Sequence, residues 1–180
     1  WCIDQTPLSL TTTYTNGTGT PLYQWYSNSI NSITGGTLLS GATAASYTPS
    51  TISDGEIYYY CVITFPSISG GCEIITSDTA LITVNLNPII TAVTATICSN
   101  TNFLIAPTTG NGNIVPDETT YTWSQPLINP VGAVTGFSAQ AIPQTEISQF
   151  LVNTTTSTAT VTYTVTPTSG ICVGAPFTIT

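Results

Sequence analysis

The sequence predicts an all-β protein built from two tandem antiparallel β-sandwiches. Segments rich in Thr, Val, Ile and Tyr alternate with segments of Gly, Pro, Asn and Ser, which is typical of strands separated by turns. Apolar residues recur with the period of two that marks a strand with one buried face, and helical periodicity is nearly absent. The 180 residues suffice for one ordinary domain or two small ones.

The strand-like segments fall into two groups on either side of Pro88. Because proline has no amide hydrogen to give to a strand ladder, it interrupts any sheet at this point. We therefore expect two domains, at residues 1–87 and 88–180, joined by a short and semi-rigid link. The expected strands are 8–14, 22–26, 56–65 and 79–86 in the first half, and 102–105, 119–123, 149–152, 158–167 and 176–180 in the second.

A weak internal repeat supports two domains. Each half begins with a cysteine, Cys2 or Cys98, and continues with an aromatic strand around Trp25 or Trp123. Each half then turns through Ser-Gly to a further cysteine. Strand alternation places large side chains on one face in both halves, where they would form the cores of two sandwiches. The expected core residues are Tyr23, Trp25, Tyr59, Cys61, Ile63, Tyr121, Trp123, Val161, Tyr163 and Val165.

The composition excludes several function classes. Lys, Arg and His are absent, and eight acidic residues give a formal net charge of −8. Phosphate backbones and anionic lipids are bound through cationic side chains, so we expect neither nucleic acid nor membrane contact. A nucleophile activated by His or Lys cannot be built. We expect no enzyme activity, no catalytic residues and no cofactor.

Five widely spaced cysteines favour disulfides in an oxidising compartment. A zinc site would need close pairs of cysteines, or histidines near them, and the sequence offers neither. The sequence, which begins at Trp1, contains no visible signal peptide. We expect the chain to be a segment of a larger secreted protein whose targeting signal lies outside it.

Both halves resemble known families. Trp25 and the run Asp54-Gly55-Glu56-Ile57-Tyr58-Tyr59-Tyr60-Cys61 resemble an immunoglobulin-like domain, with Tyr59 at the tyrosine-corner position. The second half, through Tyr121-Thr122-Trp123 and the run Val161-Thr162-Tyr163-Thr164-Val165-Thr166-Pro167, resembles the PKD-like repeats of giant bacterial surface proteins. The resemblance implies secretion, often by the type IX route of gliding bacteria, and membership of a long adhesin or filament.

The resemblance also implies a disulfide pattern. Cys2 would pair with Cys72 and Cys98 with Cys172, each bond tying the start of a domain to its last hairpin. Cys61 would then be a buried free thiol. The competing pairing is Cys2 with Cys61.

Calcium is the one metal for which the sequence offers ligands. Asn111, Asn113, Asp117 and Glu118 carry side-chain oxygens within one Gly-rich loop, although their spacing does not fit an EF-hand. The alternative is a solvated acidic loop.

Three residues are candidate glycosylation sites. Asn16 and Asn153 begin triplets that fit the N-glycosylation pattern. Thr79, within Asp78-Thr79-Ala80, resembles the O-glycosylation motif of the same bacterial group.

Two functions remain open. In the first, the chain is a stalk segment that holds a distal adhesive region away from the cell, with neighbouring repeats of the same polypeptide as its partners. In the second, loops at the sandwich ends bind a glycan or a protein. Self-association into a filament through an uncharged strand edge is a variant of the first. Either function places the chain at the cell surface, outside the cell.

Overall fold

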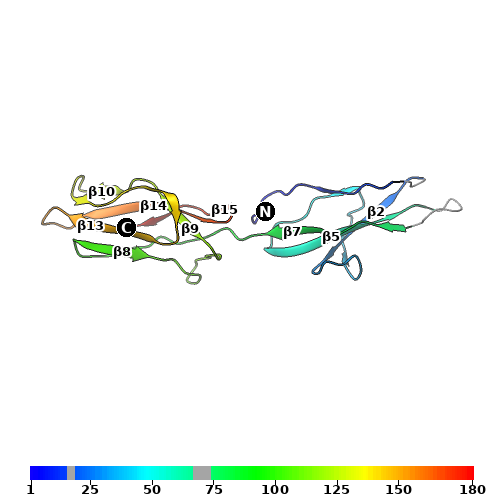
Figure 1. Ribbon diagram of the computed structural model, residues 1–180, viewed down its shortest axis with the longest axis horizontal. Helices are drawn as coiled ribbons and strands as arrows, with labels where there is room; N and C mark the ends of the chain where they lie inside the picture. The colour runs from blue at the N-terminus through cyan, green and yellow to red at the C-terminus, as the bar shows by residue number, and fades with distance from the viewer. Residues whose placement is uncertain (16–18, 67–73) are drawn as a thin grey trace. The chain divides into compact units, whose positions relative to one another are not determined.

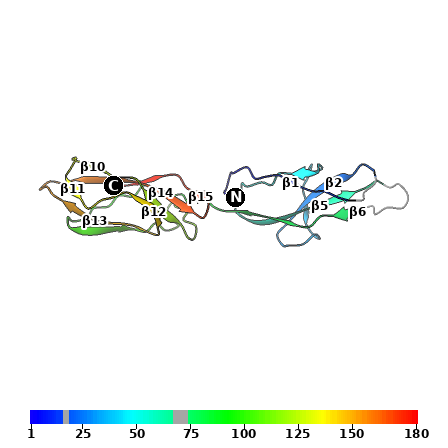
Figure 2. The same ribbon diagram turned by 45° about the horizontal axis from the view of Figure 1, so that its top comes forward.

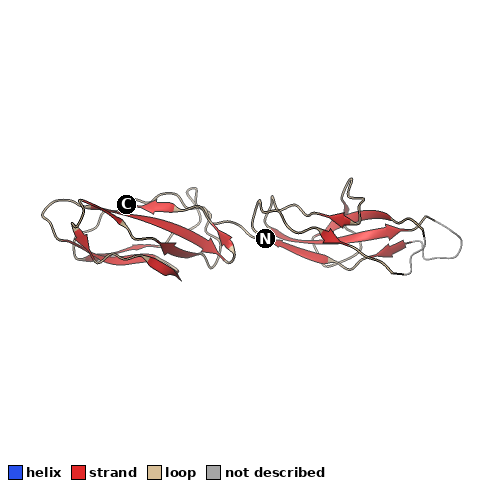
Figure 3. Ribbon diagram, turned by 90° about the horizontal axis from the view of Figure 1, so that it is seen from above, coloured by secondary structure: helices blue, strands red, loops and turns tan. Residues whose placement is uncertain are grey.

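A computed structural model describes residues 1–15, 19–66 and 74–180. The chain divides into two compact units, Trp1–Asn85 (unit 1) and Leu86–Thr180 (unit 2). The division lies two residues before the predicted boundary at residues 87 and 88. In the described ranges every regular element is a strand (Figure 3), so the predicted all-β class is confirmed. No helix in these ranges is long and apolar enough to cross a membrane.

Unit 1 is organised around its longest strand, β5. This strand pairs along one side with β2, and along its other side with β7 near its start and β6 near its end. A small second sheet faces this one, and all the strand pairs are antiparallel (Figure 2). The strands are β1 (Leu10–Thr11), β2 (Leu22–Asn28), β3 (Thr37–Leu38), β4 (Ser46–Tyr47), β5 (Gly55–Thr64), β6 (Ile74–Thr76) and β7 (Ala80–Val84).

The core of unit 1 follows the predicted alternation. Trp25 lies opposite Cys61 across the β2–β5 ladder, and both side chains are buried. The Trp25 indole donates its Nε1 hydrogen to the carbonyl oxygen of Ala44 at 2.9 Å. Tyr47 from the second sheet packs between the rings of Trp25 and Tyr59. The strand pattern therefore closes a sandwich around one tryptophan, although Tyr23 is only partly buried.

Unit 2 places its longest strand, β14, at the centre of a six-stranded sheet. β14 pairs with β10 and β9 on one side and with β16 and β15 on the other. β12 extends the sheet beyond β9, and a three-stranded sheet in the order β11-β13-β8 faces it (Figure 1). The strands are β8 (Thr101–Ile105), β9 (Thr120–Trp123), β10 (Leu127–Asn129), β11 (Val134–Thr135), β12 (Gln140–Gln144), β13 (Ile147–Asn153), β14 (Thr160–Ser169), β15 (Cys172–Val173) and β16 (Phe177–Ile179).

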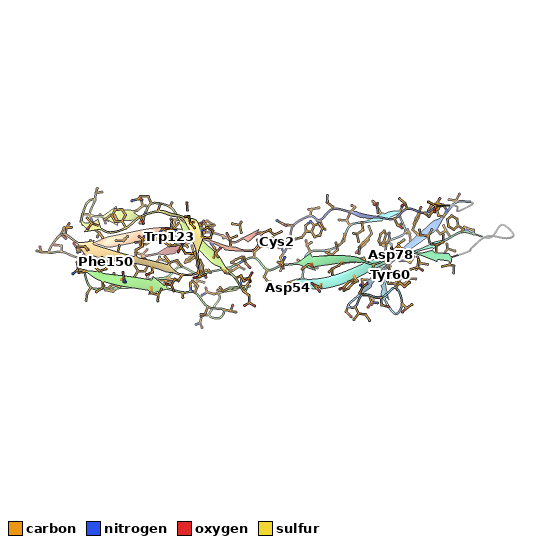
Figure 4. All side chains as sticks on the ribbon, viewed as in Figure 1. Cys2, Asp54, Tyr60, Asp78, Trp123 and Phe150 are labelled. Atoms are coloured by element: carbon orange, nitrogen blue, oxygen red, sulfur yellow. The ribbon has the colours of Figure 1, made fainter. Side chains whose placement is uncertain are left out.

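The core of unit 2 repeats the tryptophan arrangement of unit 1. Trp123, labelled in Figure 4, lies opposite Val165 and donates its Nε1 hydrogen to the carbonyl oxygen of Ser138 at 3.0 Å. Tyr163 is 2% exposed, and its ring centre lies 5.2 Å from that of Phe103 on the facing sheet. Because the two tryptophans have the same register and the same kind of hydrogen bond, the weak sequence repeat reflects a structural one.

The chain that enters each unit pairs in parallel with that unit's last strand. In unit 1 the N-terminal amino group of Trp1 donates to the Thr83 carbonyl oxygen at 2.9 Å. In unit 2 the amide of Val93 donates to the Thr178 carbonyl oxygen, also at 2.9 Å. The residue of unit 2 that corresponds to Trp1 is therefore Val93, and the residue that corresponds to Cys2 is Thr94.

Candidate functional site

The described residues form a groove at one end of unit 2. Its volume is about 600 Å³, and it lies between the polypeptide of residues 94–99 and the loop that connects β13 to β14. The ends of β13 and β16 and the start of β14 complete it. The groove thus opens between the two sheets of the sandwich, at the end where Thr180 follows β16.

The groove has an apolar floor and a rim of hydroxyl groups. The floor consists of core side chains, and its volume falls in the range of sites that take up small ligands or single side chains. None of the described residues that line it has a charged side chain. The floor residues are Phe103, Val134, Leu151, Tyr163 and Ile179, and the hydroxyl residues are Thr94, Thr96, Ser99, Thr155, Thr156, Ser157, Thr158, Thr160 and Thr180.

Asn153 fixes the two sides of the groove to each other. Its amide hydrogen is donated to Ser99 Oγ at 2.9 Å, which fastens the entering polypeptide to the end of β13. Its Nδ2 donates to the Ser157 carbonyl oxygen at 2.8 Å, and its Oδ1 accepts from the amide of Thr155 at 2.9 Å. The loop that forms one wall is therefore held as an Asx-type turn, so the groove is built into the fold.

A close approach between two strands shapes the floor. Gly136, which directly follows β11, has φ +90, and a Cβ there would lie only 2.1 Å from the carbonyl oxygen of Phe150. Only glycine allows β13 to pass this close. The approach brings Val134 of β11 opposite Asn153 and onto the groove floor.

Tyr163 is the titratable group beneath the groove. Its hydroxyl donates to Gln149 Oε1 at 2.9 Å. Desolvation by burial raises the pKa of Tyr163 to about 12. The phenol therefore stays neutral across the physiological range, where it can donate a hydrogen bond but cannot act as a base.

The carboxylates of unit 2 lie at the opposite end of its strands. Glu146 precedes Ile147, which pairs with Ile105 at the far end of β8. The carbonyl oxygen of Asp117 accepts a hydrogen bond from Ser169 Oγ at the far end of β14. Since Glu118 adjoins Asp117, all three acidic residues of the unit are remote from the groove.

The cysteines correct the predicted disulfide pattern. Cys2 and Cys172 each take part in a disulfide, whereas Cys61 and Cys98 are free. The predicted bond between Cys98 and Cys172 is therefore wrong, as is the competing bond between Cys2 and Cys61. Cys72 lies outside the described residues.

Strand geometry explains the first correction. Cys98 lies at the groove, beside the start of β14, whereas Cys172 pairs with Ser169 at the end of the same ten-residue strand. At about 3.3 Å per residue these points are roughly 30 Å apart, but bonded cysteines need Cα atoms within about 7 Å. The predicted disulfide assumed that Cys98 is the unit 2 counterpart of Cys2. The backbone hydrogen bonds show that the counterpart of Cys2 is Thr94.

Cys61 and Cys98 have contrasting surroundings. The Cys61 thiol is fully buried beside Trp25, and desolvation raises its pKa. Cys98 is exposed and lines the groove. Cys61 is thus the free buried thiol that the sequence predicted, and Cys98 is an accessible thiol that the sequence did not predict.

In the loop predicted to bind calcium, the Asn113 side chain is occupied by hydrogen bonds to Thr91. Asn113 Oδ1 accepts from the amide of Thr91 at 2.8 Å and from its hydroxyl at 3.0 Å. Asn111 and Glu118 take left-handed turn conformations, at φ +52 and +59. In the described ranges no three His, Cys, Asp or Glu side chains gather in a way that could hold a metal ion. Asn113 therefore anchors the loop to the start of unit 2, and calcium binding by Asn111, Asp117 and Glu118 stays a prediction.

The glycosylation candidates lie in different settings. The Thr79 hydroxyl donates to Asn31 Oδ1 at the surface of unit 1. The Asn153 side chain takes part in the turn described above, where its Nδ2 donates one hydrogen to the Ser157 carbonyl oxygen. Asn16 lies outside the described residues.

Sequence reasoning missed the groove altogether. The sequence identified several floor residues as core. Whether a hollow opens above them depends on the path of residues 94–99, which the sequence does not predict. These residues are exposed and belong to no strand. A run without clear alternation, from Thr94 to Asn100, was the only signal available.

Comparison with known families gives two matches that together cover nearly the whole chain. Residues 95–180 match the PKD-like domain, and residues 1–86 match a domain of unknown function, DUF8696. No curated protein and no solved structure matches the chain. The predicted PKD-like character of the second half is therefore confirmed, and the groove belongs to a unit that is similar to PKD-like domains.

Proposed function

We propose that this chain is a structural repeat segment of a large secreted cell-surface adhesin or filament, in which it spaces a distal adhesive region from the cell. The observation that carries the proposal is the direct succession of two sandwich units, each closed around its own tryptophan. The similarity of the second unit to PKD-like domains favours an extracellular structural or adhesive module.

The chemistry of the groove supports a role without catalysis. Its hydroxyl groups have no His, Lys or Arg to activate them, because the sequence contains none. The acidic residues of unit 2 lie at the other end of the sandwich. A hydroxyl without a base is a poor nucleophile, so we propose that the chain is not an enzyme.

The cysteines support an extracellular location. Cys2 and Cys172 each take part in a disulfide, and disulfides persist mainly outside the reducing cytoplasm. Secretion by the type IX route and a part in gliding motility belong to the proposal on the strength of the sequence resemblance alone.

Cryo-electron tomography of cells that carry the parent protein tests the proposal, with a gold-labelled antibody against unit 2 to locate the chain. A stalk segment would place the label along the shaft of a thin surface structure. Label at the outer tip, or inside the cell, would contradict the stalk function.

The groove favours a second candidate function, binding of an uncharged glycan or peptide at the end of unit 2. The experiment that separates the two is a screen of the 180-residue chain against neutral glycans and peptides. Saturable binding that a bulky residue at Thr158 abolishes would favour the binding module, whereas the stalk function predicts no such binding.

A further inference from the structure

We propose that strand β8 of unit 2 pairs with the β8 strand of a second copy of this chain, in the antiparallel direction and centred on Phe103. The β11-β13-β8 sheets of the two copies then join into one continuous sheet. The inference goes beyond the proposed function, because it assigns a surface and a partner that the chain has on its own.

β8 is an edge strand, and one side of its backbone has no partner. It has a single neighbour in its sheet, β13, and Figure 1 shows it at the border of unit 2. Within the described ranges, no backbone group of Thr101–Ile105 bonds to a segment other than β13. The amide and carbonyl groups on the free side of an edge strand form a template for another strand. The backbone therefore determines the kind of occupant, which is an extended segment of polypeptide.

The other strand edges of unit 2 have features that hinder such pairing. β12 contains Pro143 and has an irregular register with β9, β10 is followed directly by Pro130, and β11 has only two residues. β8 has five residues in regular register, with no proline and no charged side chain. Proline, irregular register and short length all protect edges from pairing. Among these edge strands of unit 2, β8 is therefore the one that is open to a partner.

The distribution of charge favours an antiparallel arrangement of two copies. The chain has a net charge of −8, so two copies approach each other best where carboxylates are kept apart. Glu146 lies beside the end of β8, because it precedes Ile147, which pairs with Ile105. Antiparallel pairing centred on Phe103 places the two Glu146 residues about six residues apart along the strands, or roughly 20 Å. This separation exceeds the Debye length of about 8 Å at physiological salt, whereas parallel pairing would place them at the same end.

Leu104 lies at the centre of the proposed contact. Its side chain is on the outer face of the β11-β13-β8 sheet and is 58% exposed, and Phe150 of β13, labelled in Figure 4, lies on the same face. In a pairing centred on Phe103, Leu104 lies opposite Asn102 of the second copy. The two Leu104 residues are then diagonal neighbours about 7–8 Å apart, which long side chains can span. The pairing thus covers apolar surface that is otherwise in water.

The proposed association ends at two chains. A twofold contact uses the same strand of both copies, so it leaves no second β8 for a third chain. This outcome differs from the filament that an uncharged strand edge suggested in the sequence. Because five residues of edge give a contact below the standard size of stable interfaces, we expect a dissociation constant on the order of 0.1–1 mM. Chains held side by side on a surface would reach such effective concentrations.

Sedimentation equilibrium of the 180-residue chain tests the pairing. All samples carry Cys98→Ser, because the exposed thiol could otherwise link two chains through a disulfide. As the concentration rises through the expected dissociation constant, the average mass should increase from that of one chain towards that of two and stop there. A single-chain mass throughout would assign the edge to a different strand and overturn the inference. A mass that continues to rise beyond two chains would contradict the twofold contact.

Charge variants at Leu104 test the register. Leu104→Asp and Leu104→Lys each remove an apolar contact and place like charges close together across the twofold axis, so each should weaken association about tenfold. An equimolar mixture of the two variants should restore it, because opposite charges then become diagonal neighbours. Undiminished association of Leu104→Asp, or a mixture that associates no better than its components, would refute pairing through β8.

Ile142→Asp is the matched control. Ile142 is 71% exposed on β12, the edge that contains Pro143, and the substitution adds the same charge as Leu104→Asp. It should leave association unchanged, and an equal weakening would show that net charge, and not the β8 contact, was measured. Failure of the pairing is distinguishable from failure of the stalk function, because the position of the antibody label on cells does not depend on association in solution.

Discussion

At the scale of single residues, Gly136 carries two separable constraints. Its φ of +90 strains any other residue, and a Cβ would also meet the Phe150 carbonyl oxygen at 2.1 Å. Gly132 is the matched control, since it has φ +78 but open space around its Cβ position. We expect Gly136→Ala to lower the free energy of unfolding by about 3 kcal/mol and Gly132→Ala by about 1 kcal/mol. Urea denaturation measures the unfolding free energy of both variants. Equal decreases would mean that β13 can move away from a Cβ at residue 136 at no cost in free energy.

The cysteines give a second prediction at this scale. Without reductant, a neutral alkylating reagent should modify Cys98 in the native chain and should reach Cys61 only after denaturation, because that thiol is buried and its pKa is raised. Cys2 and Cys172 should stay unmodified until a reductant is added. Peptide mass spectrometry distinguishes the four residues. A native chain in which Cys98 is protected and disulfide-linked to Cys172 would contradict the structure.

At the scale of elements, β14 is held to the facing sheet through Tyr163. Tyr163→Phe removes the hydrogen bond to Gln149 and should cost about 1 kcal/mol of unfolding free energy. Tyr121→Phe is the control, because Tyr121 is equally buried and packs mainly through its ring against Phe177. A loss as large in Tyr121→Phe would show that ring packing, and not the Tyr163 hydroxyl, was measured.

Tyr163 also predicts how stability depends on pH. Its pKa rises from 10.0 to about 12 on folding, so the folded state holds the proton more tightly than the unfolded state. The stability that this group contributes is complete below pH 10 and is lost as the pH rises from 10 to 12. The Tyr163→Phe variant should therefore lose less unfolding free energy than the unsubstituted chain between pH 10 and 12. Denaturant titrations at a series of fixed pH values measure this difference. Identical slopes would place the alkaline transition in other tyrosines.

The strands that the sequence predicted are those whose own side chains bury a face. β2, β5, β9 and β14 alternate around Trp25, Cys61, Trp123 and Val165, and this pattern is local. Short strands such as β3, β11 and β15 were missed, because two residues carry no periodicity and pair only through a partner distant in sequence. The disulfide pattern failed for the same reason, since it depends on which strand ends meet.

At the scale of the molecule, the two cores predict two separable stabilities. Trp25 packs with unit 1 residues and Trp123 with unit 2 residues. Truncating a buried tryptophan to alanine costs about 3–5 kcal/mol, a large part of the stability of a small domain. We expect Trp25→Ala to increase amide hydrogen exchange across unit 1 while leaving β13 and β14 protected, and Trp123→Ala to do the reverse. Hydrogen-exchange mass spectrometry resolves the units within one sample, so each variant contains its own control. If either substitution deprotects both units to the same extent, the chain unfolds as one cooperative body, and its description as two serial modules would have to be abandoned.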